Sequence, residues 1–173
     1  VRPDQLADEI EALLGEIRES YGWFGLEPQF AFSTKPDKAL GDPALWEKAE
    51  GLIVEAFRRA GIEYTLKPKD GTFYAPKIDI QIEDALGRSW QTATIQVDLT
   101  MLPERFDLTY VDESGQAQRP MAIHRAIYGS LERFIGILVE HFGGAFPLWL
   151  APVQAVVVPI ADRHVAAAQE LGA

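Results

Sequence analysis

Apolar residues recur at intervals of three and four near the N-terminus, which predicts an amphipathic helix over residues 3–21. A second helix is predicted where Asp42 can cap the first turn, Pro43 fits that turn and Gly61 ends the apolar stripe. A short strand is expected between them, at residues 29–34. The first third of the chain is therefore predicted to be helix, strand, helix.

From residue 62 the apolar period changes from 3.6 to 2. We expect strands at 63–67, at 77–83, at 88–98 and at 105–112, with turn residues between the last three. This order predicts an antiparallel meander. Its strands would bury one face and carry polar side chains on the other.

Helical spacing returns over residues 124–142 and ends at two glycines. His124 and Arg133 would then lie on one helix, roughly 13 Å apart along its axis. They are too far apart to hold one atom, but they could hold two ends of a small ligand.

The pattern changes again beyond Leu150. An apolar run at 155–160 precedes a helix-like segment at 162–173, which indicates the opening strand and helix of a second, α/β domain. We therefore divide the chain into residues 1–150 and 151–173. For the first part we predict an α+β fold, an antiparallel β-sheet flanked by helices.

Composition narrows the possible functions. The chain is 47% hydrophobic and 24% charged, as in an ordered globular protein. Its formal charge of -10 opposes non-specific attraction to nucleic acid or to an anionic membrane, and the absence of cysteine excludes thiolate chemistry. No apolar run is long enough to span a membrane, so we predict a soluble, cytoplasmic protein without a membrane partner. Because the chain begins with Val1 and stops within a helical pattern, we expect it to be a section of a longer protein.

Several polar residues could carry chemistry. Pro76 stiffens the backbone before Lys77, and Tyr74 offers both a ring and a hydroxyl. Lys77 could meet a phosphate, although on these residues alone a solvated lysine is the simpler interpretation.

The segment 88–98 holds two glutamines and two threonines among aromatic and β-branched residues. A buried amide without a partner costs about 1–3 kcal/mol, so this pattern indicates a wet pocket. In a regular strand Gln91 and Gln96 fall on opposite faces. Either a bulge lies between them or only one of them faces a ligand.

His124 taken alone is more often a structural group than a metal ligand, and neither His141 nor His164 is an obvious partner for it. Glu132 and Arg133 form either an ion pair or a ligand-binding pair. None of the common nucleotide, hydrolase or metalloprotease motifs is present. The residues alone therefore leave an α+β domain with a polar-lined sheet.

Five spaced segments, in a fixed order, resemble the threonyl-tRNA synthetase family. They are Phe-Tyr-Ala-Pro-Lys-Ile-Asp at 73–79, Trp-Gln-x-x-Thr-Ile-Gln-x-Asp at 90–98, Leu-Pro-x-Arg-Phe at 102–106, Ile-His-Arg-Ala-Ile-x-Gly-Ser-x-Glu-Arg-Phe at 123–134 and Trp-Leu-Ala-Pro-Val-Gln at 149–154. The resemblance implies the C-terminal part of a class II catalytic domain over residues 1–150, followed by the start of an anticodon-binding domain. By that pattern residues 99–101 carry one extra residue before Leu102, and Ala75 replaces a usual glycine.

The family joins threonine to ATP, supplied with Mg2+, as threonyl adenylate, transfers it to tRNA(Thr) and forms homodimers. By this resemblance Arg133 packs on adenine with its charge near the γ-phosphate, and Lys77 lies near the reacting phosphate. The resemblance also assigns nucleotide contacts to Gln91, Thr94 and Ser130, and threonine contacts to Tyr74 and Gln96.

His124 matches one of three protein ligands to a zinc ion in this family. Zinc takes the amino and hydroxyl groups of threonine, so valine, which lacks the hydroxyl, loses a ligand. The resemblance places the other two ligands, and the arginine that holds the α-phosphate, upstream of Val1. We therefore expect the chain alone to be inactive and to expose apolar surface where missing segments would pack.

Two alternatives stay open. One is a non-catalytic relative that uses the sheet and Arg133 to bind a nucleotide or a protein. The other is a different class II synthetase, such as the prolyl enzyme, whose next domain begins with a similar Ala-Pro-Val-Gln segment. The Ile-His-Arg-Ala block at 123–126 argues against the prolyl enzyme.

Overall fold

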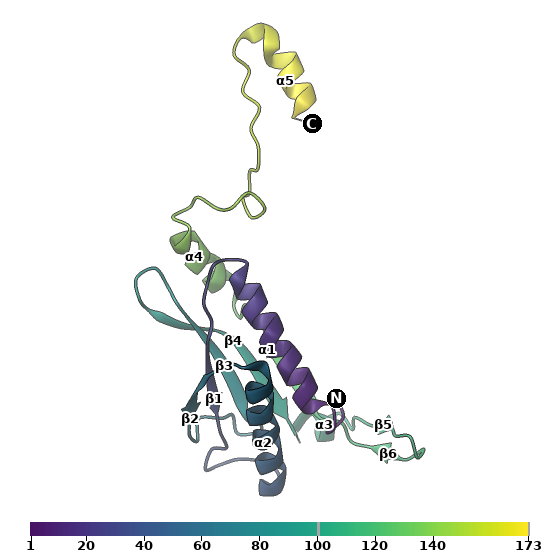
Figure 1. Ribbon diagram of the computed structural model, residues 1–173. Coiled ribbons are helices and arrows are strands. Elements are labelled where there is room, and N and C mark those ends of the chain that lie inside the picture. Colours follow the sequence, from purple (N-terminus) through teal and green to yellow (C-terminus); the bar gives the residue numbers. More distant parts are fainter. Residues whose placement is uncertain (100, 173) are drawn as a thin grey trace.

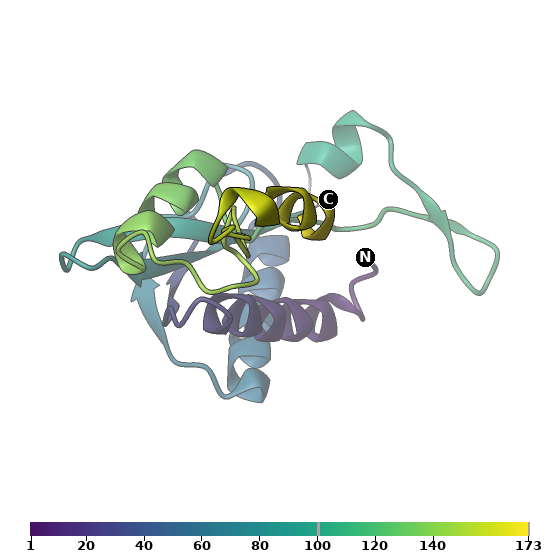
Figure 2. The same cartoon turned by 90° about the horizontal axis from the view of Figure 1, so that it is seen from above.

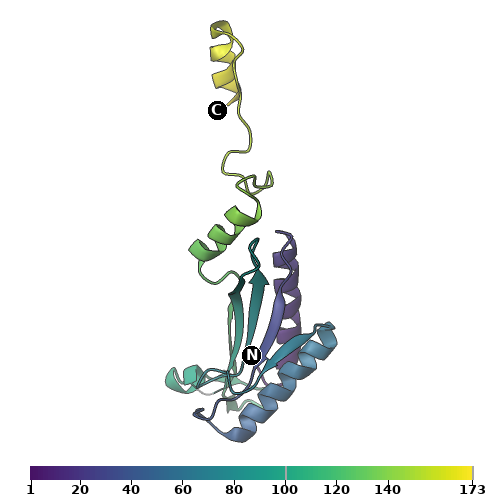
Figure 3. The same cartoon turned by 90° about the vertical axis from the view of Figure 1, so that its left-hand side faces the viewer.

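A five-stranded sheet forms the centre of the structure, a computed structural model that describes residues 1–99 and 101–172 (Figure 1). The strand order is β2-β1-β3-β4-β7. The strands are β1 (Gln29–Ser33), β2 (Tyr64–Lys67), β3 (Lys77–Glu83), β4 (Ser89–Asp98) and β7 (Ala122–Ala126). Helices α1 (Leu6–Gly22) and α2 (Pro43–Ala60) cover one face of this sheet (Figures 1 and 3).

The two covering helices form where the sequence predicts them. The Asp42 side chain accepts a hydrogen bond from the Ala44 backbone N–H at 2.9 Å, and Gly61 ends α2 in a left-handed conformation with φ 61°. Apolar residues of both helices pack against the apolar face of the central strands. The largest fully buried side chains are Leu6, Ile10, Leu14, Ile17, Tyr21, Phe32, Trp46, Ile53, Phe57, Ile78, Ile80 and Ile82.

Strict alternation in β3 separates the two faces of the sheet. Ile78, Ile80 and Ile82 are buried against the helices, whereas Lys77 and Asp79 project from the opposite face. The predicted alternation is therefore confirmed, and the polar face of β3 carries the functional candidates.

The predicted meander is wrong at two places. β2 pairs in parallel with β1, because the α2 crossover between them returns the chain in the same direction. The predicted strand at 105–112 is largely absent: the Asp98 carboxylate accepts bonds from the first backbone N–H groups of α3 (Met101–Arg105) and so begins a helix directly after β4. The β3–β4 hairpin is antiparallel, as predicted.

A short ribbon replaces the rest of that strand. β5 (Tyr110–Val111) pairs with β6 (Ala117–Gln118), and this ribbon projects away from the main sheet (Figures 1 and 2). The segment 99–101, which was predicted to carry one residue more than the family pattern, includes Thr100, and Thr100 lies outside the described residues.

The predicted helix at 124–142 is also wrong over its first part. His124 lies on β7, opposite Gln96 of β4, and helix α4 (Leu131–His141) begins seven residues later. Gly129, with φ 60°, and the N-cap Ser130 separate the strand from the helix. The 13 Å estimate for His124 and Arg133 on one helix therefore does not apply.

The C-terminal segment extends away from the sheet (Figures 1 and 3). The predicted strand at 155–160 has no partner among the described residues and forms no ladder. The predicted helix is present as a short 3-10 turn (Asp162–His164) followed by α5 (Val165–Leu171), whereas Ala173 lies outside the described residues. The domain boundary near Leu150 stays a prediction.

Helix α4 carries an apolar stripe on its outer side. Phe134, Ile137 and Leu138 are buried, whereas Leu131 and Ile135 expose 62% and 57% of their surface. Apolar surface of this extent fits the expectation that further protein packs here. None of the described helices combines the length and apolar character that crossing a membrane requires, and the cytoplasmic location stays a prediction.

Candidate functional site

A bulge in β4 brings the polar residues of this strand onto one face. Gln91 and Ala93 pair with adjacent residues of β3, so Thr92 is an extra residue between them. Because of this extra residue, the Gln91 side chain lies on the same face of the sheet as Thr94 and Gln96. Of the two alternatives left open by the sequence, the bulge is therefore confirmed.

Asp79 lies at the centre of this polar face. Its carboxylate accepts hydrogen bonds from Gln91 Nε2 at 2.7 Å and from Thr94 Oγ1 at 3.3 Å, and it forms an ion pair with Lys77 Nζ. Three predicted site residues thus meet at one buried carboxylate. Asp79 was not among the predicted site residues, although the alternation of residues 77–83 places it on the same face as Lys77.

A second group lies where β4 meets β7. Tyr74 donates from its hydroxyl to Gln96 Oε1 at 2.6 Å, and His124 pairs opposite Gln96 in the sheet. The ring centroids of Tyr74 and His124 are 6.1 Å apart. The structure therefore brings these three predicted residues together.

The environment of His124 fits a ligand to a metal ion in one respect. Its Nε2 atom is buried and has no hydrogen-bond partner among the described residues. A carboxylate oxygen of Asp98 lies 3.6 Å from this atom. A buried imidazole nitrogen without a hydrogen bond is unusual, and coordination to zinc would satisfy it. However, no cluster of three or more His, Cys, Asp or Glu residues suited to a metal ion exists within residues 1–99 and 101–172. His124 fits zinc, but only as one ligand of a larger set.

The remaining predicted residues surround a cavity of about 230 Å³ at the start of α4. Its lining comprises Gln91, Thr92, Ala93, Thr94, Ala126, Gly129, Ser130 and Arg133. The cavity opens between the bulge and the loop that precedes α4. It depends on a close backbone approach, because a Cβ atom on Gly129 would lie 2.7 Å from the Thr92 carbonyl oxygen.

Arg133 is held from two sides. Ser130 caps α4 by accepting a bond from the Arg133 backbone N–H at 3.4 Å, and the guanidinium carbon lies 5.5 Å from the centre of the Trp90 ring. Ser130 Oγ donates a hydrogen bond to Glu132 Oε2 at 2.9 Å. The Glu132 backbone N–H and this hydrogen bond lower the pKa of the Glu132 carboxyl group. The Arg133 side chain thus lies beside the Trp90 ring and lines the cavity, next in sequence to the Glu132 carboxylate.

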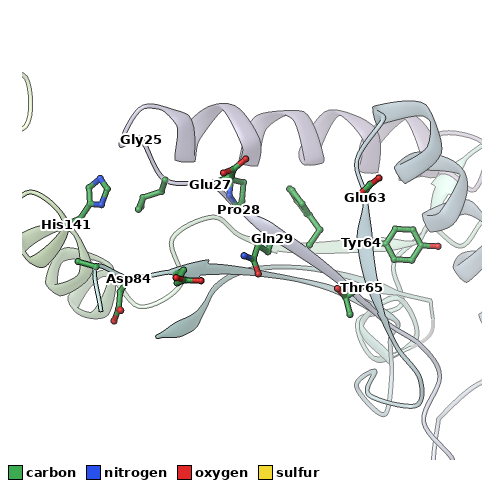
Figure 4. A pocket seen from close by; sticks show the side chains of 13 residues that line it. Gly25, Glu27, Pro28, Gln29, Glu63, Tyr64, Thr65, Asp84 and His141 are labelled. Atoms are coloured by element: carbon green, nitrogen blue, oxygen red, sulfur yellow. The ribbon is translucent and has the colours of Figure 1, made fainter. Parts of the chain in front are cut away.

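A larger cavity, of about 750 Å³, lies elsewhere (Figure 4). It is lined by the start of β1 and β2, the turn after β3 and the end of α4, and it contains none of the predicted site residues. Its carboxylates are Glu27, Glu63, Glu83 and Asp84, and the one imidazole, His141, is hydrogen-bonded to the Phe24 carbonyl at 2.9 Å. Four carboxylates oppose a polyphosphate ligand, so the smaller cavity beside Arg133 is the better candidate for a nucleotide.

Comparison with known proteins defines the class. Residues 1–142 match the tRNA synthetase class II core domain (G, H, P, S and T), and the chain belongs to this family. Relatives that match nearly the whole chain include threonine-tRNA ligases, so the resemblance predicted from the five segments is confirmed. The ligase of Symbiobacterium thermophilum is 53% identical over 99% of this chain, and that of Anaeromyxobacter dehalogenans strain 2CP-C is 52% identical over 100% of it.

Solved structures agree with this assignment and confirm the predicted fold class. A crystal structure described as the RNA binding domain of threonyl-tRNA synthetase from Cryptosporidium parvum matches 99% of this chain with a TM-score of 0.90 and 40% identity. A putative threonyl-tRNA synthetase from Aeropyrum pernix matches 99% with a TM-score of 0.76 and 27% identity. This chain covers 43% and 41% of those two chains, and 26% of the two bacterial ligases.

Proposed function

We propose that this chain is a section of a threonine-tRNA ligase that activates threonine with ATP and transfers it to tRNA(Thr). One observation carries the proposal: a single polar face of β4 joins the Tyr74 and Gln96 group at one end to the cavity beside Arg133 at the other. Threonyl adenylate has an amino acid at one end and a nucleotide at the other, and a face with two such ends suits it.

The nucleotide would occupy the cavity at the start of α4. Arg133 has a flat cation that can stack on adenine and also place charge near a phosphate. Gln91, Thr94 and Ser130 supply polar groups around it. Lys77 projects from the same face and would stabilise negative charge that develops on the reacting phosphate of Mg2+-bound ATP.

Threonine would lie near Tyr74 and Gln96, with His124 as one ligand to zinc. Bound zinc would supply direct coordination of the amino and hydroxyl groups of the substrate. The unsatisfied Nε2 atom of His124 supports this role. The two further ligands would come from protein outside the described residues.

We extend the proposal to the arrangement of the complete protein. Residues 1–150 would belong to the catalytic domain and residues 151–173 to the start of an anticodon-binding domain. The exposed apolar stripe of α4 is consistent with a contact to further protein, and we propose a homodimer through the catalytic domain. The relative from Cryptosporidium parvum is described as an RNA binding domain, which supports tRNA as a partner.

ATP–pyrophosphate exchange by the full-length protein that contains this chain tests the proposal. We expect exchange with threonine, weak exchange with valine and none with proline, and we expect a zinc chelator to abolish it. Lys77→Ala and Arg133→Ala should each lower the rate by about 10²-fold or more. Lys67→Ala, at the end of β2 and separated from β3 by β1, is the matched control and should keep the rate. Exchange driven by proline would support the prolyl alternative, and nucleotide binding without exchange would support a non-catalytic relative.

A further inference from the structure

Asp79 is buried on the polar face of β3, and the proposed function gives it no contact with threonine, ATP or zinc. Only 1% of the residue is exposed, and a carboxylate so deeply buried is unfavourable unless charged or polar partners compensate it. Its partners are Lys77, Gln91 and Thr94. Each of these three residues has a predicted contact to ATP or to its reacting phosphate, so the burial of Asp79 is linked to the site.

The carboxylate determines which way the Gln91 amide faces. An ionised carboxylate can only accept hydrogen bonds, so the Gln91 atom at 2.7 Å from Asp79 is the NH2 nitrogen. The carbonyl oxygen, Oε1, therefore points away from Asp79. Because Gln91 lines the cavity beside Arg133, this oxygen is left to accept a bond from a ligand.

Thr94 is constrained in the same sense. Its hydroxyl has one proton, which is directed to Asp79 at 3.3 Å. The lone pairs of Thr94 Oγ1 are then free to accept, and Thr94 also lines the cavity. Two neighbouring acceptors match a ligand group with two adjacent donors, and the hydroxyls of a ribose are such a group.

Lys77 is held by the same carboxylate. Its side chain is 16% exposed and forms an ion pair with Asp79, while Asp70 lies 3.6 Å from the same nitrogen. A flexible lysine held in this way keeps its ammonium group on the polar face. It retains further N–H donors for a phosphate oxygen.

We propose that Asp79 is a positioning residue that anchors the Lys77 cation and turns Gln91 and Thr94 so that their oxygens accept from the ribose hydroxyls of the nucleotide. This role rests on the proposed function. Asp79 itself touches no substrate, and it acts through the three side chains that it holds.

Asp79→Asn in the full-length protein tests this role, because asparagine keeps the shape but removes the charge and adds donors. Threonine-dependent pyrophosphate exchange would be measured with ATP, 2′-deoxyATP and 3′-deoxyATP. We expect kcat/KM for ATP to fall by about tenfold or more and the preference for ATP over the deoxy analogues to shrink by a similar factor. The KM for threonine should change by less than about twofold, because the Tyr74 hydroxyl and the Gln96 amide are hydrogen-bonded to each other, whereas Asp79 holds Lys77, Gln91 and Thr94.

Ile80→Val is the matched control, since Ile80 adjoins Asp79 on β3 but faces the helices. It should leave the preference for ATP over the deoxy analogues unchanged. A folded Asp79→Asn protein with wild-type kcat/KM and wild-type sugar preference would overturn the proposal. If Asp79→Asn does not fold, Gln91→Met and Thr94→Val replace it, and retention of the full sugar preference by both would overturn the proposal equally. Failure of the proposed function is distinct, because the unmodified protein would then show no threonine-dependent exchange.

Discussion

The hydroxyl oxygen of Tyr21 lies 2.8 Å from Thr92 Oγ1, which links helix α1 to the extra residue of the β4 bulge. The same oxygen is 2.5 Å from the Ile127 carbonyl oxygen. A carbonyl can only accept, so the Tyr21 proton goes to Ile127 and the Thr92 hydroxyl supplies the proton of the other bond. Burial raises the pKa of Tyr21 to about 12, so this proton is retained at neutral pH. One buried side chain thus connects the β4 bulge, which lines the cavity beside Arg133, to the segment that follows β7.

Tyr21→Phe should weaken this cavity. Removal of the hydroxyl takes a hydrogen-bond partner from Thr92 Oγ1 and from the Ile127 carbonyl oxygen, and we expect the free energy of unfolding to fall by about 1–3 kcal/mol. The KM for ATP should rise in the full-length protein. Tyr64→Phe on β2 removes the same atom away from the cavity and is the control for denaturant unfolding and for KM. Equal effects of the two variants on KM would contradict a buttressing role for Tyr21.

Gly129→Ala should also disrupt the cavity. Gly129 has φ 60°, and an added Cβ would meet the Thr92 carbonyl oxygen at 2.7 Å, so both backbone strain and a clash oppose alanine. The strain alone costs about 1–2 kcal/mol. Gly136→Ala is the matched control, because Gly136 is exposed within α4 and has nothing within 4 Å of an added Cβ.

For Gly136→Ala we expect a gain of about 0.5–1 kcal/mol, since alanine favours helix. Thermal unfolding of both variants makes the comparison. A Gly129→Ala protein as stable as the Gly136→Ala protein would show that the bulge and the loop can move apart without loss.

Asp84 predicts a pH dependence of stability. Burial alone would raise its pKa, but hydrogen bonds from Trp90 Nε1 at 2.7 Å and from the Arg88 backbone and side chain outweigh burial and lower the pKa well below its usual range. A pKa lower in the folded than in the unfolded state contributes stability that is present above about pH 4 and is lost as the pH falls further.

Asp84→Asn should therefore lower the free energy of unfolding at pH 7. It should also make this free energy fall less steeply as the pH is lowered below about 5. Urea unfolding at a series of pH values measures both effects. Asp37→Asn is the control, because the Asp37 side chain is 76% exposed. An unchanged pH profile in Asp84→Asn would mean that other carboxylates determine acid unfolding.

The chain of residues 1–173 should be inactive on its own. The described residues provide one histidine suited to zinc and no cluster of three metal-binding side chains, so threonine would lack its proposed recognition site. We expect no threonine-dependent pyrophosphate exchange from the purified chain beside an active full-length protein. Measurable exchange by the chain would show that the zinc ligands are not required for activation.

Much of the fold could be predicted because the local pattern and the tertiary structure agree. Both α1 and α2 have an apolar stripe with helical spacing, α2 also has the Asp42 cap, and the apolar and polar residues of β3 alternate without exception. Around His124 the sequence pattern and the tertiary structure disagree, because a helix was predicted where β7 lies. A five-residue strand and the helix after it share apolar residues at spacings that fit one longer helix, and the strand exists only because β4 offers it a partner.

The site could be predicted only in part for a related reason. The resemblance identified Lys77 and Gln91, but a sequence does not show which side chains face each other across a sheet. Asp79 joins them only through the register of β3 and β4, which depends on the bulge at Thr92. The parallel pairing of β2 with β1 could not be predicted either, because the sequence of a strand does not encode the direction of the strand beside it.

A crystal structure of the full-length protein with a non-hydrolysable analogue of threonyl adenylate tests the central claim most directly. We predict that the nucleotide lies in the cavity between Gln91 and Arg133, with its ribose toward Thr94 and its threonyl end toward Gln96 and His124. An analogue bound instead in the acidic cavity between Glu63 and His141, or away from the polar face of β4, would contradict the account.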